Sequence, residues 1–390
     1  MTPSLRLPAV IMLLITGILA GAELGKIAPL VEWYRTERGF SLVLSGWLTA
    51  MIGLFVALAA LPAGVAIERI GPRRTVLAGS LALAAGGLAL AFLESPSAIL
   101  AARLVEGLGY VILVIALPAV MAAISTPAWR ATVLAIWSCF VPVGFGVSDL
   151  LAGVMLPEPG PASYLFVLAL AYAIAATIGV LLMARVPDVD HRAQAAEAGG
   201  SLQGAFTLPV LSIAASFGLW VVMTVSFFSF MPTYVAGAGT VMLMSAGAVA
   251  LTVPVGNVVA SALVKGRDAR FAAGLGAVGL VGTALLAWPA FGDAGPGAMT
   301  AAAVAVAILG GVTGSALYAA IPLVTPRGGS VAVAIGMVAQ AGGIGTVIGP
   351  PLAGWVIERY GWPGFAAFTT LFALAATLAI TPLLARKIGG

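Results

Sequence analysis

Long apolar runs of about 20 residues recur along the whole chain, and short segments between them carry most of the charged residues. A helix of about 20 residues is long enough to cross the hydrocarbon core of a bilayer. The pattern therefore predicts twelve membrane-spanning helices. We place them at residues 7–29, 43–66, 73–93, 97–124, 131–155, 162–185, 208–235, 241–264, 270–291, 297–324, 330–356 and 363–385.

The composition supports an integral membrane protein. Of 390 residues, 61% are hydrophobic and 8% are charged, and the mean hydropathy is +1.13. Soluble domains carry about 25% charged residues, so a soluble fold could not solvate this surface. The first apolar run is too long for a signal peptide, and we expect it to remain as the first helix.

The basic residues indicate the orientation. With twelve spans both termini lie on one side, and that side receives 13 of the 18 lysines and arginines. Because positive loops stay in the cytoplasm, both termini are predicted to be cytoplasmic. The basic residues are spread over loops and form no patch, so we expect no nucleic-acid partner.

Several kinds of chemistry are excluded at this stage. The chain has one cysteine and one histidine, which rules out an internal disulfide, a Cys/His metal site and a histidine-based catalytic triad. It has no phosphate-binding loop of the Gly-x-x-x-x-Gly-Lys-Ser/Thr type. We therefore expect no enzyme, no metal and no cofactor, and an ion or solute gradient as the energy source.

One polar stretch and an internal repeat divide the chain. Hydrophobicity drops at residues 187–207, which predicts a cytoplasmic linker between six-helix bundles at 1–186 and 208–390. A shift of 201 residues lays Pro142-Val143-Gly144 on Gly343-Ile344-Gly345, and Leu151-Ala152-Gly153 on Leu352-Ala353-Gly354. Two related bundles with a solute site between them are an architecture of secondary transporters.

Two motifs carry a family resemblance. The second and third predicted helices are joined by a basic turn that contains Gly64, Glu68, Arg69, Gly71, Arg73 and Arg74. The fourth has Arg103-x-x-Glu106-Gly-x-Gly. Both resemble signatures of the major facilitator superfamily. The resemblance implies an all-α membrane fold of two pseudo-symmetric six-helix bundles, a charge latch formed by the turn, an arginine linked to proton transfer, and a monomer in a bacterial inner (plasma) membrane.

Charged residues inside the predicted spans are the candidates for proton coupling: Glu23, Arg103, Glu106 and Asp149. Charge within a span is costly and is usually functional. Glu23 and Arg103 lie at similar depth, so we expect them to meet, and a proton on Glu23 would then release Arg103. Asp149 lies either in the solute cavity or at the outer mouth.

The solute site is predicted from polar and aromatic residues of both halves. Lys26 either belongs to it or extends toward the lipid headgroups. No acidic or basic residue falls in the last six spans. The residues proposed to contact solute are Lys26, Arg103, Tyr110, Trp220, Phe227, Phe230, Asn257, Tyr318 and Gln340.

The function that follows is proton-coupled transport, by symport or antiport, of a small amphiphilic or zwitterionic organic solute, with the solute, protons and the bilayer as partners. The charges in the spans sum to minus one, which does not favour an anion. Uptake or exchange of a small anion held by Arg103 and Lys26 remains an alternative. A non-transporting receptor or a lipid scramblase is the alternative from another class.

Overall fold

The structure is a computed structural model that describes residues 6–126, 129, 133–134, 136–185, 206–237, 242–292, 294–326 and 329–385. The regular elements in this part of the chain are helices. In the N-terminal half they are α1 (Arg6–Gly25), η2 (Ala28–Leu30), α2 (Val31–Arg38), α3 (Leu42–Ala50), η3 (Met51–Gly53), α4 (Leu54–Ile70), α5 (Pro72–Leu90), α6 (Pro96–Ile124), α8 (Phe140–Met155) and α9 (Pro161–Ala184). In the C-terminal half they are α11 (Leu208–Gly237), α12 (Ala246–Ala250), α13 (Val253–Val264), α14 (Ala269–Phe291), α15 (Pro296–Val324) and α16 (Val331–Ala385).

The helices agree with the predicted spans. Within the described residues, nine helices are long and apolar enough to cross a membrane, and the apolar helix α8 is shorter. One of the nine, α16, contains the last two predicted spans, and Gly361 interrupts its helical geometry. The all-α membrane fold is confirmed, and every predicted span has a helical counterpart. Of the predicted linker, residues 187–205 lie outside the described part, so the domain boundaries stay a prediction.

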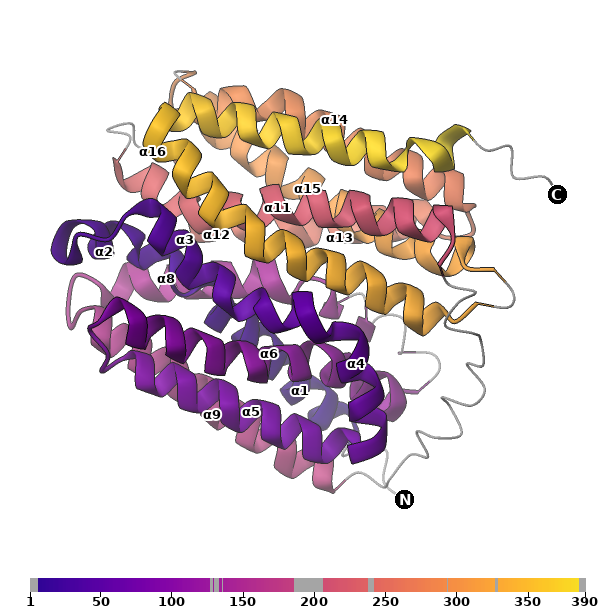
Figure 1. The fold of residues 1–390 in the computed structure, drawn as a ribbon, viewed down its shortest axis with the longest axis horizontal. Coiled ribbons are helices and arrows are strands. Elements are labelled where there is room, and N and C mark those ends of the chain that lie inside the picture. The colour runs from indigo at the N-terminus through magenta and orange to yellow at the C-terminus, as the bar shows by residue number, and fades with distance from the viewer. Residues whose placement is uncertain are drawn as a thin grey trace.

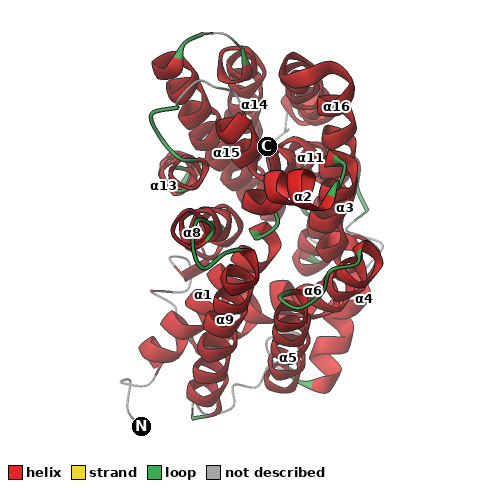
Figure 2. Cartoon of the chain, turned by 90° about the vertical axis from the view of Figure 1, so that its left-hand side faces the viewer, coloured by secondary structure: helices red, strands yellow, loops and turns green. Residues whose placement is uncertain are grey.

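The long helices run side by side (Figure 1). Figure 2 views the same bundle from one end: α1, α4, α5, α6, α8 and α9 form one group, and α2 and α3 reach across to α11 and α16 of the C-terminal half. Within the N-terminal half, α1 packs on α8 and α5 on α6; within the C-terminal half, α11 packs on α16 and α14 on α15. Several contacts join the halves, including α11 on η2 and on α2. Two further contacts matter for the site. One is α16 on α3 and α4, and the other is α12 on α8. We call these the α3–α16 seam and the α8–α12 seam.

The first helix differs from its predicted extent of residues 7–29. Helix α1 ends at Gly25, and a turn at residues 26–27 leads into η2 and α2. Pro29 accounts for the break, because proline has no N–H to donate and its ring clashes with the carbonyl four residues earlier. The break leaves main-chain carbonyls inside the bundle without helical partners, and these carbonyls become important at the site.

The predicted tight turn between the second and third spans is present. Helix α4 ends at Ile70, α5 begins at Pro72, and Gly71 between them has φ of 94°. Glycine adopts this backbone conformation without the strain that a Cβ would bring. The side chains of Glu68 and Arg69 lie outside the described residues, as does the surrounding of Gly64, so the charge latch stays a prediction.

Close packing of glycine joins α1 and α8. A Cβ on Gly144 would overlap main-chain atoms of Gly21 and Ala22. Gly17 and Gly25 face Trp137 and Phe145 in the same way. The glycine stripe of the first helix therefore faces α8, as small residues at membrane helix interfaces commonly do.

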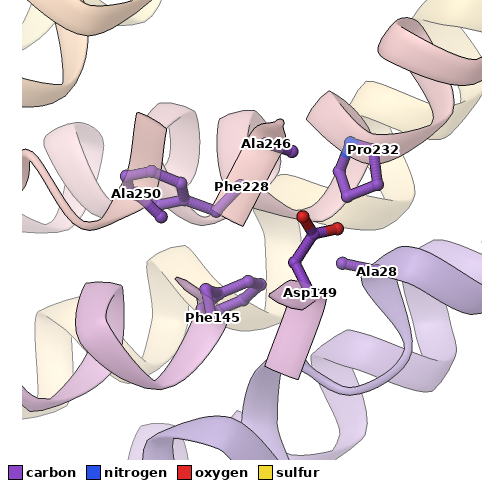
Figure 3. Close-up of a pocket in the computed structure, with 7 residues that line it drawn as sticks. All are labelled: Ala28, Phe145, Asp149, Phe228, Pro232, Ala246 and Ala250. Carbon is purple, nitrogen blue, oxygen red and sulfur yellow. The ribbon is translucent and has the colours of Figure 1, made fainter. Parts of the chain in front are cut away.

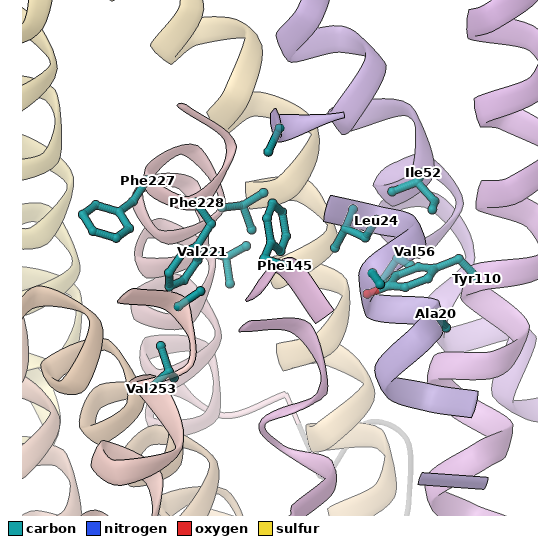
Figure 4. Close-up of a cluster of buried hydrophobic side chains, with 14 of the residues drawn as sticks. Ala20, Leu24, Ile52, Val56, Tyr110, Phe145, Val221, Phe227, Phe228 and Val253 are labelled. Carbon is teal, nitrogen blue, oxygen red and sulfur yellow. The ribbon is translucent and has the colours of Figure 1, made fainter. Parts of the chain in front are cut away.

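Apolar side chains from both halves form one continuous core. Figure 4 shows Phe145 of α8 between Phe228 of α11 on one side and Leu24 of α1 on the other. The ring centroids of Phe145 and Phe228 are 5.8 Å apart. The halves thus meet through packed side chains near the seams.

Candidate functional site

Four charged side chains form a buried cluster in the N-terminal half. Glu23 and Lys26 come from the broken first helix, and Arg103 and Glu106 come from α6, one turn apart. All four side chains have zero exposure. We call this set the charged quartet. Its two positive and two negative charges balance, which lowers the high cost of burying each one alone.

Lys26 lies between the two carboxylates. Its ammonium contacts Glu23 Oε2 and donates to Glu106 Oε1 at 2.5 Å. The alternative that Lys26 extends toward lipid headgroups is wrong, because the side chain is completely enclosed. Glu23 Oε1 is buried and has no hydrogen-bond partner among the described residues.

Arg103 holds the broken helices together. Its Nη1 donates to Glu106 Oε2 at 2.6 Å and to the Glu23 main-chain carbonyl at 2.8 Å, and its Nη2 donates to the Leu24 carbonyl at 3.1 Å. Its Nε donates to the carbonyl of Leu48 at 2.6 Å. Leu48 lies just before the 3₁₀ turn η3, where the second span also departs from α-helical geometry. The planar guanidinium suits several acceptors in fixed directions.

Glu23 and Arg103 are in contact, as expected, but through a different group of Glu23. The prediction placed the Glu23 carboxylate on Arg103, but the structure places the Glu23 main-chain carbonyl there and gives the carboxylate to Lys26. The reason is the break after Gly25, which frees the carbonyls for Arg103. A proton on Glu23 would consequently act first on Lys26.

Sequence reasoning missed a hydroxyl pair beside the quartet. Tyr164 of α9 is fully buried, and its hydroxyl lies 2.6 Å from Ser148 Oγ and 3.2 Å from the Lys26 main-chain oxygen, to which it donates. Another carbonyl of the broken helix is thereby satisfied. A tyrosine and a serine in apolar spans gave no signal of this contact, because their partner is main chain.

Asp149 lies apart from the quartet, at the α8–α12 seam. Its Oδ2 accepts a hydrogen bond from the main-chain N–H of Gly247 at 2.7 Å. Figure 3 shows the carboxylate pointing toward Ala246 and Pro232. Asp149 lines a narrow cavity of about 10 Å³, the size of one water molecule, and also an open groove of about 230 Å³. Asp149 is thus a contact between the halves that lies beside an open groove.

A second carboxylate joins the halves at the same end of the bundle. Glu358 Oε1 of α16 accepts a hydrogen bond from the N–H of Leu42, the first residue of α3, at 2.6 Å. We call this end, which also carries α2, the α2 end. The turn at Gly71 lies at the opposite end, because α3 and α4 lead from one to the other. Glu358 lies in the loop predicted between the last two spans, where a charged residue gives no sign of a site.

The predicted solute-contacting residues of the C-terminal half fall into three places. Phe230 is completely buried, and Phe227 packs on Phe291 inside the half at a centroid distance of 5.7 Å. Both side chains are thus buried in this structure, and their contact with solute stays a prediction. Trp220 and Tyr318 each lie 5.0 Å from the Phe217 ring and are partly exposed.

The two predicted amide side chains lie on the seams. Asn257 Nδ2 donates to Ser138 Oγ at 3.1 Å and to Cys139 Sγ at 3.0 Å. Gln340 Nε2 donates to the carbonyl of Ala57 at 2.9 Å. Tyr110 is buried in the N-terminal half, 6.4 Å from the Phe140 ring. The structure thus does not gather all the predicted solute residues into one pocket. Across the described residues, no three His, Cys, Asp or Glu side chains converge as metal ligands.

Comparison with known proteins places this geometry in a family. The model of the Major Facilitator Superfamily matches residues 13–327. No curated protein matches the chain. Among solved structures, the chain is similar to a bacterial homolog of the human lysosomal transporter Spinster in an inward-facing and unoccupied conformation. The TM-score is 0.71 with 14% identity, over 98% of this chain and 95% of that chain. At this identity the likeness concerns the fold.

Proposed function

The chain belongs to the major facilitator superfamily, and on this premise we propose that it is a proton-coupled transporter that moves a small organic solute by alternating access. A transporter, rather than an enzyme, is what the family and the structural likeness support. The coupling ion, the mechanism and the solute are the proposal. The observation that carries it is the charged quartet, because membrane proteins seldom bury ionisable residues without a functional reason.

Glu23 is the proposed proton acceptor of the quartet. Its Oε1 has no hydrogen-bond partner among the described residues, and its Oε2 contacts the Lys26 ammonium. Glu106, in contrast, uses one oxygen for Lys26 and the other for Arg103. A proton on Glu23 weakens its attraction to Lys26 and leaves Lys26 to Glu106 alone. The turn at residues 26–27 then becomes free to shift, and the first helix with it.

The proposed orientation follows from charge. Arg73 and Arg74 lie at the Gly71 end, so the positive-inside rule assigns that end, both termini and the linker to the cytoplasm of a bacterial cell. The α2 end then faces outward. Contacts at Asp149 and Glu358 close the two halves at this outer end, which corresponds to an inward-facing arrangement. The Gly71 turn is proposed to act as a latch in the opposite state, and the chain is proposed to work as a monomer.

The solute is proposed to be amphiphilic or zwitterionic. The quartet is neutral as a whole, and both of its cations are matched by carboxylates and fully buried. Capture of an anion by Lys26 and Arg103 would require those contacts to open. Aromatic surface with polar atoms is offered by Trp220 and by the exposed face of Tyr318. The buried indole N–H of Trp220 has no hydrogen-bond partner within the described residues.

The solute class is tested by the thermal stability of the purified protein with organic anions, cations and zwitterions. A ligand at 100 times its Kd stabilises the folded state by about 2.7 kcal/mol. Stabilisation by amphiphiles or zwitterions supports the proposal, whereas stabilisation by anions alone replaces it with the anion carrier. If liposomes containing the protein scramble lipid and move no solute, transport itself is refuted.

Proton coupling is tested with Glu23→Gln in proteoliposomes. The variant is expected to retain solute exchange under equal pH but to lose accumulation driven by a pH gradient, because glutamine keeps the shape and cannot release a proton. Wild-type protein provides the paired measurement. Accumulation at the wild-type level in Glu23→Gln would show that Glu23 does not carry the proton.

A further inference from the structure

The two seams are equivalent in the repeat but differ at one position. The 201-residue shift that relates the halves lays Gly46 on Gly247 and Asp149 on Pro350. In the structure these pairs meet in the corresponding way: Gly46 packs on the main chain of Pro350, and Gly247 packs on Gly146 and Asp149. In the α3–α16 seam, Pro350 at the equivalent position therefore packs on Gly46 without a carboxylate. At this position only the α8–α12 seam carries a carboxylate; the carboxylate of the α3–α16 seam, Glu358, lies eight residues farther along the chain and falls on Pro157 under the same shift.

A second pair confirms that the seams correspond. The same shift lays Cys139 on Gln340, and each contributes one side of a polar contact across its seam, with Asn257 and with the Ala57 carbonyl respectively. Asn257 falls on Val56 under this shift, one residue from Ala57, so the two polar contacts lie at neighbouring positions along the seams. Asp149 and Pro350 thus differ within a region where the packing of the two seams corresponds.

Among the described residues that line the cavity and the groove at Asp149, no other charged side chain occurs. The residues that face Asp149 contain no ionisable side chain: Ser245 and Ala246 before and in α12, Phe228 and Pro232 of α11, and Ala28 and Pro29 of η2. The buried hydroxyls of Ser148 and Tyr164 bond to each other, and Tyr164 also donates to the Lys26 main-chain carbonyl beside the quartet. The hydrogen bond from Gly247 is the contact that offsets the charge of the Asp149 carboxylate.

Asp149 also lines an open groove. The open groove of about 230 Å³ that Asp149 lines runs along the outer part of α8, past Gly153 and Leu156. A carboxylate that accepts from an N–H makes a stronger bond when ionised than when protonated. Proton binding at this position therefore weakens a contact that holds the two halves together.

We propose that Asp149 is a gate-positioning residue: its ionised carboxylate holds α8 against Gly247, and a proton that arrives through the groove releases this contact and lets the halves separate at the α2 end. This inference rests on the alternating access proposed above. It requires neither a known solute nor the proposed role of Glu23. It assigns two proton-sensitive groups to different tasks, with Glu23 inside the N-terminal half and Asp149 between the halves.

The test measures the distance between the halves in the full chain without solute. The only cysteine is replaced by Cys139→Ser, and spin labels are placed by Glu158→Cys and Leu243→Cys, at the exposed ends of the α8–α12 seam. Pulsed electron resonance in nanodiscs at pH 5.5 and pH 8 gives the ratio of open to closed populations. Loss of a charge-assisted bond changes such a ratio by about tenfold or more. The ratio is expected to rise at low pH by this amount.

Two variants test whether Asp149 causes the pH dependence of the open population. Asp149→Asn, which keeps an acceptor for Gly247 without the charge, is expected to raise the open population at pH 8 and to remove the pH dependence. Glu358→Gln, the matched change on the other seam, is expected to keep the pH dependence. Unchanged pH dependence in Asp149→Asn, or none in the parent protein, overturns the proposal. A pH-dependent gate in protein that transports nothing would leave the inference standing and refute the proposed function.

Discussion

Replacement of Lys26 by methionine is the sharpest test of the charged quartet. The change leaves Glu23 and Glu106 facing each other with Arg103 as the remaining cation, so the buried cluster gains a net charge of minus one. At an effective dielectric constant of about 20, two unit charges at the 2.5 Å of the Lys26–Glu106 contact attract by about 7 kcal/mol. Desolvation of the lysine offsets part of this energy. We expect Lys26→Met to lower the free energy of unfolding by about 3–5 kcal/mol.

A second substitution should restore much of the loss. In Lys26→Met/Glu23→Gln the cluster is neutral again, and the Arg103–Glu106 pair at 2.6 Å is untouched. The double variant is expected to be more stable than Lys26→Met by about 2 kcal/mol or more. Glu23→Gln alone completes the double-mutant cycle. The stability of all four purified proteins is measured by unfolding with sodium dodecyl sulfate in mixed micelles. A double variant no more stable than Lys26→Met would refute the electrostatic account of the quartet.

Two further changes test how the helices are held. Arg103→Lys should lower the free energy of unfolding by about 2–3 kcal/mol, because a single ammonium cannot reach Leu48 and the two carbonyls of the first helix together; stability equal to the wild type would contradict this. Gly144→Ala should abolish the folded peak in size-exclusion chromatography, because its Cβ meets the main chain of Gly21, whereas Gly153→Ala on the same helix has free space and should elute normally. Equal behaviour of the two alanine variants would argue against close packing of α1 on α8.

The spans could be predicted because length and hydrophobicity alone decide them. The same holds for the approach of the first helix to α6, since Glu23 and Arg103 share a depth. The atoms that meet could not be predicted. They depend on the break that Pro29 causes, which frees the carbonyls of Glu23 and Leu24 for Arg103 and places Lys26 between two carboxylates.

In the C-terminal half, the sequence likewise could not show which face of a helix is buried. Helix α11 carries apolar residues on all sides, so the sequence does not reveal which aromatic rings are buried; Phe227 and Phe230 are buried, and their contact with solute stays a prediction. The partner of Asp149 was out of reach for a different reason. It is the main-chain N–H of Gly247, 98 residues away, and a glycine amide leaves no side-chain signal.

Proton movement in proteoliposomes loaded with a pH-sensitive dye tests the central claim most directly. A gradient of a solute that stabilises the wild-type protein is imposed across vesicles without an initial pH difference. The account predicts that the internal pH changes with solute movement in wild-type vesicles and stays constant in Glu23→Gln vesicles, while solute exchange persists in both. Solute movement without a pH change in the wild type would contradict proton coupling and leave a uniporter in its place.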